Sequence, residues 1–410
     1  MNVDVLVVGA GPAGLSAAVE LRRLGVGTVL VADREASAGG VPRHSWHTGY
    51  GLRDLRRIMT GPAYARALAD AAVSAGAEVL VGTTVTGLSC GRCAQLTSVR
   101  GIETVQARAV LLATGCRERP RAARLVPGDR PAGVMTTGEL QQRVYLGGER
   151  LAGAAVVVGA EHVSFSAATT LAHAGARVVA LVTEFGRQQS YFAFRLGAAL
   201  RWRVPVWTGC MVSRIVGHDE LSGVEVTSVG SGRVRFVPCS TVVFTADWIP
   251  DHELARAAGL EIDAGTRGPV VDTALETSWA GVFAAGNLVH AAETAGIAAL
   301  SGRHAARSIA AALGTVADTG VARVPVRVEA PLRWISPNAV GSAAAPPLGR
   351  FVLRSGEFRR LARLEVRQDG RLLARSRPLR LIPGRPVHLD AAWLAQVDPN
   401  SGPVRVATRS

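Results

Sequence analysis

The feature that most constrains the fold is a strand–loop–helix–strand pattern at the start of the chain, VDVLVVGAGPAGLSAAVELRRLGVGTVLVADRE, residues 3–35. Gly9 makes the tight turn, Gly11 lets the backbone approach a pyrophosphate, and Gly14 lets helix and strand pack closely. Asp33 ends the second strand, where an acid binds ribose hydroxyls. The pattern therefore predicts a βαβ unit that binds a dinucleotide, with the phosphates at the helix N-terminus.

A second strand–loop–helix pattern follows in AAVVVGAEHVSFSAATTLAHAGARVVALVTE. Its loop offers Gly159, Glu161 and Ser164 where a dinucleotide loop has three glycines. Glu161 adds bulk and negative charge at the place of the pyrophosphate. Pairing of Glu161 with an arginine or His162 would relieve the repulsion. We favour a domain that keeps the fold but has lost tight pyridine-nucleotide binding. The alternatives are an altered NADH or adenine-nucleotide site, with Glu184 on the ribose, and an ordinary strand–turn–helix.

The composition fits a soluble α/β protein of two or three domains, with 410 residues, 48% hydrophobic residues and 46 glycines. All 46 basic residues are arginine, and the net charge is +14. Residues 321–410 hold 16 arginines against six acidic residues, a net of +10, so the other 320 residues carry +4. We interpret this stretch as a solvated basic face or as a surface for an acidic protein partner, because no nucleic-acid motif accompanies it.

The sequence predicts a cytoplasmic protein. It shows no signal peptide and no apolar stretch of about 18 residues that would span a membrane. The five cysteines form no disulfide framework. Cys90 and Cys93 have the spacing of a redox or zinc pair, but they lie between two strand-like runs. We therefore expect a hairpin turn with free thiols, and no metal site.

Two later stretches identify the dinucleotide. ARAVLLATGCRERP is a buried strand ending in Ala113, Thr114 and Gly115, and TSWAGVFAAGNLVHAAETAGIAAL is a strand, Gly286, Asn287 and a helix of small residues. Together they resemble the ATG and TSxxGVFAAGD segments of the two-dinucleotide-domain flavoproteins, the glutathione- and thioredoxin-reductase superfamily. The resemblance covers roughly the first 315 residues and implies FAD. Asn287 replaces the usual Asp and keeps a hydrogen bond to a ribityl hydroxyl.

The segment GGVPRHSWHTGYGLRDLRRIMTGPAYARAL, residues 39–68, lacks the redox cysteine pair of the disulfide reductases. It is similar instead to the flavoprotein subunits of hydrogen cyanide synthase, octopine/nopaline oxidase and dye-linked amine dehydrogenases, and to flavoproteins that accompany a glycerol-3-phosphate-dehydrogenase-type partner. CRERPRAARLVPGDRPAGVMTTGELQQ and FTADWIPDHELA fit the same pattern. The resemblance implies a partner flavoprotein dehydrogenase that oxidises the substrate, often assisted by a small [2Fe-2S] protein. Several relatives end in a cysteine-rich module, but residues 322–410 contain no cysteine, so any cluster belongs to another chain.

We therefore expect an α/β architecture in three parts. An FAD-binding Rossmann-like domain comprises residues 1–118 and 265–318, and an inserted second NAD(P)-binding-like domain comprises 150–250. Residues 322–410 form a basic C-terminal all-β domain, sandwich-like, with turns at SGE, QDGR and IPGR.

The loop motif and the resemblance together predict the residues that bind FAD. These are Gly9, Gly11, Pro12, Ala13, Gly14, Asp33, Arg34, Gly40, Arg43, Val85, Ala113, Thr114, Gly115, Gly286, Asn287, Thr294 and Ala295.

His44 and His47 follow the glycine pair and are the predicted catalytic residues. A histidine beside the flavin moves a proton or tunes its potential; the alternative is that both only hold the loop. Arg43 binds an FAD phosphate, a substrate carboxylate or a structural partner. Glu293 is either a helix cap or catalytic, and Cys116 is a small buried filler. Tyr191 and Phe192 cover the flavin ring or a partner surface, or belong to the core.

Three functions remain open at this point. The first is an electron-transfer flavoprotein subunit of a heteromeric dehydrogenase acting on an amine, amino acid or hydroxy substrate. The second is a self-contained NADH-dependent flavin reductase or monooxygenase. The third is an assembly or regulatory subunit that holds FAD as a structural group.

Overall fold

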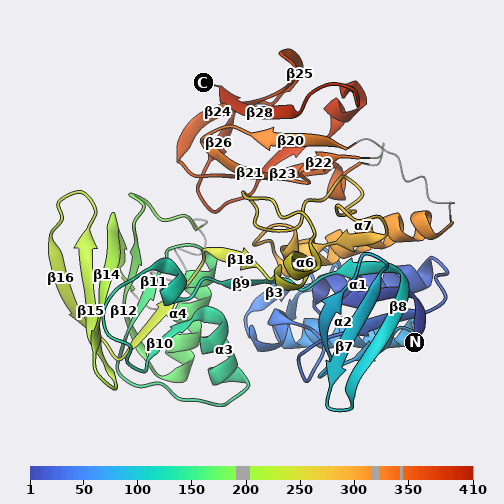
Figure 1. Ribbon diagram of the computed structural model, residues 1–410. Coiled ribbons are helices and arrows are strands. Elements are labelled where there is room, and N and C mark those ends of the chain that lie inside the picture. The colour runs from blue at the N-terminus through green and yellow to red at the C-terminus, as the bar shows by residue number, and fades with distance from the viewer. Residues whose placement is uncertain (191–203, 315–322, 342–344, 410) are drawn as a thin grey trace. The chain divides into compact units, whose positions relative to one another are not determined.

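The computed structural model describes residues 1–190, 204–314, 323–341 and 345–409. The chain divides into two compact units, one of Met1–Cys116 with Pro250–Ser410 and one of Arg117–Ile249 (Figure 1). It crosses between them at the short strands β9 (Cys116–Glu118) and β18 (Trp248–Pro250). The α/β class predicted from the sequence is confirmed.

The first unit is built on a seven-stranded sheet with the order β5-β2-β1-β8-β7-β6 and with β19 beside β8. Its strands are β1 (Asn2–Val8), β2 (Val29–Ala32), β5 (Glu78–Leu80), β6 (Thr84–Leu88), β7 (Cys93–Ser98), β8 (Gly101–Leu112) and β19 (Val282–Ala284). β1, β2, β5, β8 and β19 are parallel, whereas β6, β7 and β8 form an antiparallel meander. Cys90 lies in the turn between β6 and β7 and Cys93 is the first residue of β7, and both thiols are free, as predicted.

The helices of this sheet are α1 (Pro12–Arg23), α2 (Gly61–Ser74), α6 (Glu253–Ala258) and α7 (Ala295–Gly314). α7 packs closely against α1. A Cβ atom at Gly302 would lie only 2.0 Å from the Ala13 carbonyl oxygen, so this approach requires glycine. A small ribbon pairs β3 (Thr48–Tyr50) with β4 (Met59–Thr60). The carboxyl ends of the parallel strands β1, β8 and β19 lie at one edge, which brings the three predicted FAD segments together.

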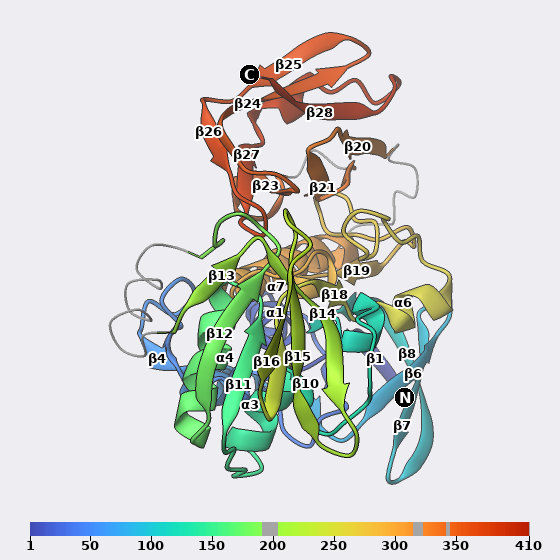
Figure 2. The same ribbon diagram turned by 90° about the vertical axis from the view of Figure 1, so that its left-hand side faces the viewer.

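The second unit has a parallel sheet with the order β10-β17-β11-β12-β13. Its strands are β10 (Val134–Thr136), β11 (Ala154–Val158), β12 (Arg177–Thr183), β13 (Val206–Thr208) and β17 (Thr241–Phe244). One face of this sheet, which carries Ala155 and Val157, is covered by helices α3 (Thr137–Tyr145) and α4 (His162–Ala174). The other face, which carries Val156, is covered by the antiparallel strands β14 (Cys210–Gly217), β15 (Leu221–Ser228) and β16 (Val234–Pro238) (Figure 2). This is the layered dinucleotide-binding fold that the second loop predicted.

The C-terminal residues form two sheets with a core between them. One sheet has the order β22-β20-β28-β24-β25, with β26 beside β24, and the other has the order β21-β23-β27. The strands are β20 (Val324–Val328), β21 (Leu332–Ser336), β22 (Ala339–Val340), β23 (Arg350–Ser355), β24 (Arg359–Gln368), β25 (Arg371–Arg375), β26 (Leu379–Leu381), β27 (Val387–Asp390) and β28 (Val404–Arg409). Phe351 and Trp393 pack at 4.9 Å between ring centroids in this core. The sandwich-like architecture is as predicted.

Candidate functional site

The glycine loop between β1 and α1 has three glycines with different reasons to be there. Gly9 has a φ of +107°, and a Cβ atom there would lie 2.5 Å from the Ala113 carbonyl oxygen. A Cβ atom at Gly14 would lie 1.9 Å from the carbonyl oxygen of Gly9. At Gly11, by contrast, a Cβ atom would meet no protein atom within 4 Å. Gly9 and Gly14 are thus required by packing, whereas Gly11 borders open space, where we predict the pyrophosphate.

The N-terminus of α1 offers free hydrogen-bond donors beside this space. Gly11 is the N-cap, no side chain caps the helix, and no acidic residue stands in its first turn. The first N–H groups therefore point at a site that favours an anion. Asp33 holds the loop in place, since its Oδ2 accepts from the Ala10 N–H at 2.6 Å and its Oδ1 from the Glu35 N–H at 2.8 Å. These residues fit the pyrophosphate and ribose of a dinucleotide.

The two neighbouring loops meet the glycine loop at the same sheet edge. The N–H of Ala113 donates to Val8 O at 2.8 Å. Gly286 has a φ of +70°, and a Cβ atom there would lie 2.7 Å from the Cβ of Ala13. The Asn287 side chain accepts from the Glu293 N–H at 2.8 Å and donates to the Glu293 carbonyl at 3.2 Å. Asn287 therefore closes the loop that leads to Thr294 and Ala295 at the start of α7.

The segment after the glycine pair also reaches the loop. A Cβ atom at Gly40 would lie 3.0 Å from the Cα of Gly11, and the N–H of Gly39 donates to Ala10 O at 2.7 Å. The Arg43 guanidinium pairs with Glu35 at 3.0 Å, while its Nε is buried without a hydrogen-bond partner. Of the roles considered for Arg43, the structure records the structural pairing.

The two candidate histidines lie in different surroundings. His44 ends the 3-10 turn Val41–His44 and is only 4% exposed. His47 is exposed, its Nδ1 lies 2.9 Å from Thr48 O, and its ring stacks on Tyr50 at 5.1 Å. The structure therefore does not bring them together as one acid–base pair, and a catalytic role for either stays a prediction.

The remaining candidates divide between the sheet edge and other places. Arg34 pairs with Asp251 at 2.9 Å, and the Thr114 hydroxyl donates to Asp251 O at 2.7 Å. Val85 lies in the hydrophobic core, two residues beyond Thr83. Cys116 is half-buried, so its prediction as a buried filler is wrong. Tyr191 and Phe192 lie outside the described residues.

Glu293 does not cap a helix, because its carboxylate points to the C-terminal sandwich. Its Oε1 lies 3.0 Å from Nη2 of Arg354, with the two side chains 10% and 7% exposed. Arg354 also donates to Ala292 O at 2.9 Å and lies over the Trp334 ring at 5.2 Å. Trp334 in turn packs on His290, whose pKa is lowered to about 3 by burial and by Arg354. Sequence reasoning missed Arg354, because it is one arginine among many in a basic stretch.

The loop of the second unit is occupied by its own side chain. Glu161 is the N-cap of α4, and its carboxylate accepts from the N–H groups of Val163 at 2.7 Å and Ser164 at 3.1 Å. The Glu161 N–H donates back to Ser164 Oγ at 3.3 Å, and the Ser164 hydroxyl lies 3.1 Å from Glu161 Oε1 and 2.7 Å from the Thr245 hydroxyl. This is a capping box, and it satisfies the donors that a dinucleotide would use. A Cβ atom at Gly159 (φ +138°) would lie 2.0 Å from the Thr245 hydroxyl, so the Thr245 side chain packs tightly against this turn.

The hydrogen bonds at the helix N-terminus hold the Glu161 carboxylate, and Arg124 also interacts with it electrostatically. Burial raises the pKa of Glu161 and, nearby, raises the pKa of Glu118 to about 7. Glu118 accepts from the Gly138 N–H at 2.9 Å. Arg124 donates to Thr245 O and Ala246 O at 2.7 Å. Glu184, the predicted ribose ligand, is exposed after β12.

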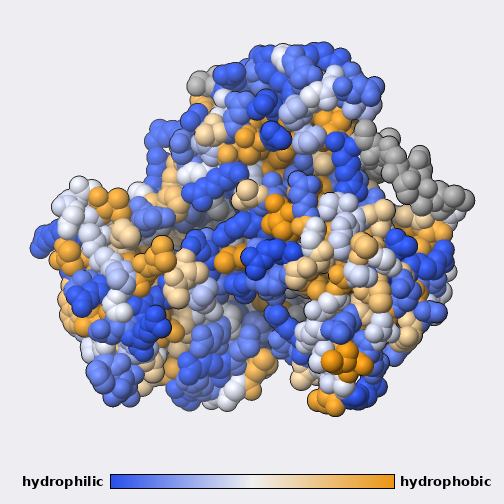
Figure 3. Space-filling model, viewed as in Figure 1, coloured by the Kyte–Doolittle hydropathy of each residue, from blue (hydrophilic) through white to orange (hydrophobic). Residues whose placement is uncertain are grey.

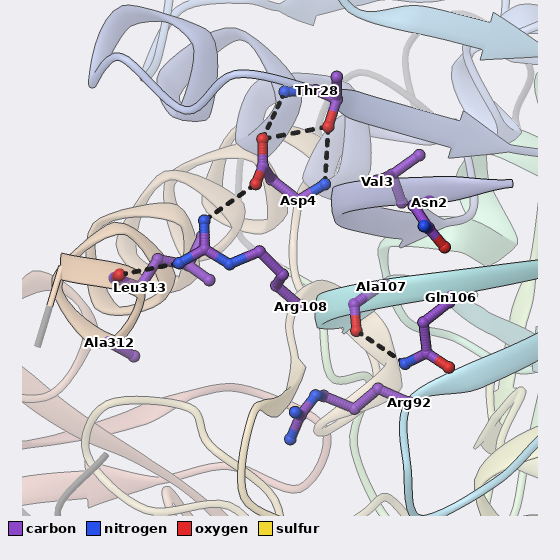
Figure 4. Close-up of a pocket in the computed structure, with 10 residues that line it drawn as sticks. All are labelled: Asn2, Val3, Asp4, Thr28, Arg92, Gln106, Ala107, Arg108, Ala312 and Leu313. Atoms are coloured by element: carbon purple, nitrogen blue, oxygen red, sulfur yellow. Dashed lines mark hydrogen bonds and ion pairs between the residues drawn. The ribbon is translucent and has the colours of Figure 1, made fainter. Parts of the chain in front are cut away.

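A hollow of about 560 Å³ lies at the other end of β1, away from the glycine loop (Figure 4). The Asp4 carboxylate inside it accepts from the Thr28 N–H at 2.8 Å, from the Thr28 hydroxyl at 3.1 Å and from Arg108 at 3.0 Å. Thr28 and Arg108 lower the pKa of Asp4. The ion pair between Asp4 and Arg108 ties β1 to β8. The hollow lies at the opposite end of β1 from the glycine loop, so it is not part of the predicted FAD site.

No helix within the described ranges is long and apolar enough to cross a membrane. No group of three or more His, Cys, Asp or Glu side chains suited to a metal ion occurs among the residues placed by the structure.

Comparisons with known proteins agree with this geometry. The pyridine nucleotide-disulphide oxidoreductase family matches residues 3–308. An opine oxidase subunit of Agrobacterium tumefaciens (strain Ach5) is 29% identical over 386 residues, which are 86% of this chain and 74% of that protein. Hydrogen cyanide synthase subunit HcnB of Pseudomonas aeruginosa is 29% identical over 287 residues, 64% of this chain and 60% of that protein. Thioredoxin reductase of T. acidophilum has the same fold, with a TM-score of 0.63 at 22% identity, over 77% of this chain and 99% of that one.

The chain belongs to the pyridine nucleotide-disulphide oxidoreductase family and is an FAD-dependent oxidoreductase. The resemblance to the two-dinucleotide-domain flavoproteins is confirmed. This chain spans 74% and 60% of the lengths of the two curated relatives, both of which are subunits of larger enzymes.

Proposed function

We propose that this chain is the electron-transfer flavoprotein subunit of a heteromeric dehydrogenase that acts on an amine, an amino acid or a hydroxy substrate. In such a complex a partner flavoprotein would oxidise the substrate and pass the electrons to this chain. The observation that carries the proposal is the Glu161 carboxylate at the N-terminus of α4, where a pyridine nucleotide would place its pyrophosphate.

The Glu161 cap opposes a pyridine nucleotide in two ways. A pyrophosphate would have to displace the carboxylate from the N–H groups of Val163 and Ser164, which leaves a buried carboxylate without donors. If both stayed, their like charges would repel by roughly 1–4 kcal/mol at about 4 Å. The second unit therefore keeps the nucleotide-binding fold for its packing, and NADH is not the electron source.

The residues of the first unit are suited to holding FAD. When bound, FAD supplies an acceptor that takes two electrons and releases them one at a time. The free N–H groups of α1 would hold the pyrophosphate, and Asp33 would bind the ribose. The N-terminus of α7 carries a partial positive charge that would favour negative charge on a flavin held beside it. The buried Glu293–Arg354 pair fixes the loop that delivers this helix end.

A partner is supported by the relatives, since the opine oxidase and hydrogen cyanide synthase proteins are both named as subunits. Residues 322–410 contain no cysteine, so this stretch does not hold a thiolate-bound [2Fe-2S] cluster.

Purification of the tagged full-length chain from its source cells tests this function. The proposal predicts a stoichiometric flavoprotein partner and flavin reduction by an amine, amino acid or hydroxy acid only in the complex. Reduction of the isolated chain by NADH would make it a reductase, and a flavin that stays oxidised in the complex would make it an assembly protein.

A further inference from the structure

The outward side of the sheet β20–β28–β24–β25 is lined by arginines that stand directly opposite one another. Arg405 lies between Arg327 of β20 and Arg367 of β24, and Arg409 lies opposite Arg363. Arg375 of β25 lies opposite Glu365. We call this surface the arginine face, made of Arg327, Arg363, Arg367, Arg375, Arg405 and Arg409.

Folding alone does not account for these residues. The opposite side of the same strands supplies the core through Leu364, Val366, Val404 and Val406, all of which are buried. The outward positions need only polar side chains, and like charges directly opposite in a sheet are destabilising. The opposed pairs Arg327–Arg405, Arg405–Arg367 and Arg363–Arg409 therefore act against the stability of the sandwich, which points to a role in binding.

The charge of the face is only partly balanced within the chain. Glu365 is its one acidic residue, and its carboxylate lies 2.6 Å from Arg375, 3.2 Å from Arg367 and 3.6 Å from Arg409. Arg327, Arg363 and Arg405 are exposed. Six arginines against one carboxylate leave a net charge of +5, and the hydrophilic surface over β24, β25 and β28 is visible at the top of Figure 3.

The chemistry of the face favours protein carboxylates over nucleic acid. Arginine side chains bind carboxylates through charge-assisted hydrogen bonds, and on this face Arg375 donates two of them to Oε1 of Glu365. None of the described residues on this side of the sheet is aromatic, so it offers no platform for stacking bases. Leu372, opposite Arg367 and 41% exposed, adds an apolar contact of the kind that protein interfaces use.

We infer that the arginine face docks an acidic protein surface. Under the proposed function, on which this inference rests for the partner's identity, that surface belongs to the substrate-oxidising protein of the complex. Docking through exposed charges speeds association and aligns the two proteins.

The test uses the full-length holoprotein and a variant in which three exposed arginines of the face are changed together, Arg327→Ser, Arg363→Ser and Arg405→Ser. The matched control removes the same charge elsewhere, with Arg23→Ser, Arg66→Ser and Arg256→Ser, all exposed. Fluorescence anisotropy measures binding to poly-L-glutamate and to a 20-base-pair DNA duplex, and sedimentation measures binding to phosphatidylglycerol vesicles. The co-purified partner protein, where present, is titrated in the same way.

We expect the face variant to bind poly-L-glutamate and the partner at least tenfold more weakly than the wild type, and the control variant to change by less than twofold. Equal losses in the two variants would overturn the inference. A loss confined to DNA or to vesicles would assign the face to nucleic acid or to a membrane and overturn it too. Absence of a stoichiometric partner would count against the proposed function, while poly-L-glutamate still decides the role of the face.

Discussion

The guanidinium of Arg354 on β23 lies 3.0 Å from the carboxylate of Glu293, in the loop that leads into α7. Both side chains are at most 10% exposed, and Arg354 also binds the carbonyl of Ala292. The pair joins the C-terminal sandwich to the loop beside the predicted flavin site. The sandwich therefore has a structural role beside the predicted flavin site, in addition to the docking role that we infer for its arginine face.

Breaking this pair is expected to be costly on either side, because the remaining charge is buried alone. We predict that Arg354→Met and Glu293→Gln each lower the free energy of unfolding by about 3 kcal/mol. The double variant should lose less than the sum of the two. Urea denaturation at saturating FAD measures this, with Arg359→Met as the control, since its pair with Glu357 is exposed and contributes about 1 kcal/mol or less. Strictly additive losses would contradict the coupling.

The glycine loop separates packing from cofactor binding. Gly14→Ala is expected to destabilise the fold, because its Cβ would meet the Gly9 carbonyl oxygen at 1.9 Å. Gly11→Ala is expected to leave the apoprotein's thermal midpoint unchanged and to weaken FAD binding at least tenfold, because its Cβ extends into open space. Apoprotein melting and FAD titration distinguish the two effects. Full FAD affinity in Gly11→Ala would place the pyrophosphate elsewhere.

Glu118 is expected to make the second unit less stable as the pH rises. Burial raises the pKa of this carboxyl from 4.5 to about 7, so the folded state favours the protonated form. Its contribution to stability is present below pH 4.5 and is lost as the pH rises to 7, by roughly 3 kcal/mol. Thermal midpoints of the wild type and Glu118→Gln, compared between pH 4.5 and 8, should diverge in favour of the variant. Parallel curves would exclude a raised pKa.

The arginine face also predicts a gain in stability on mutation. Arg405→Ser removes like-charge contacts with Arg327 and Arg367, and should raise the free energy of unfolding by about 0.2–1 kcal/mol. High salt should shrink this difference, because it screens exposed charges. A destabilised variant, or a gain that salt leaves unchanged, would show that the arginines do not repel one another.

The sequence was most informative where glycines are required. Gly9 and Gly14 are dictated by backbone contacts, and the buried runs of β1 and β8 define a parallel sheet, so the fold follows from local pattern. Glu161 was recognised as an obstacle from its position alone. Its capping of α4 depends on the rotamer of one side chain, which a pattern of residue types does not fix.

Contacts between distant parts of the chain could not be predicted in this way. Glu293 and Arg354 are 61 residues apart, and no pattern in a single sequence indicates that their side chains meet. His44 and His47 are three residues apart, yet only His44 is buried, because the 3-10 turn ends between them. The opposed arginines required the register of four strands, which composition alone does not give.

The most direct test of the central claim is an anaerobic titration of the purified holoprotein with NADH, followed by the flavin absorbance. Because the Glu161 carboxylate occupies the donors at the N-terminus of α4, we predict no bleaching by NADH, whereas dithionite reduces the flavin fully. Prompt stoichiometric bleaching by NADH would contradict the account and would make this chain a self-contained reductase.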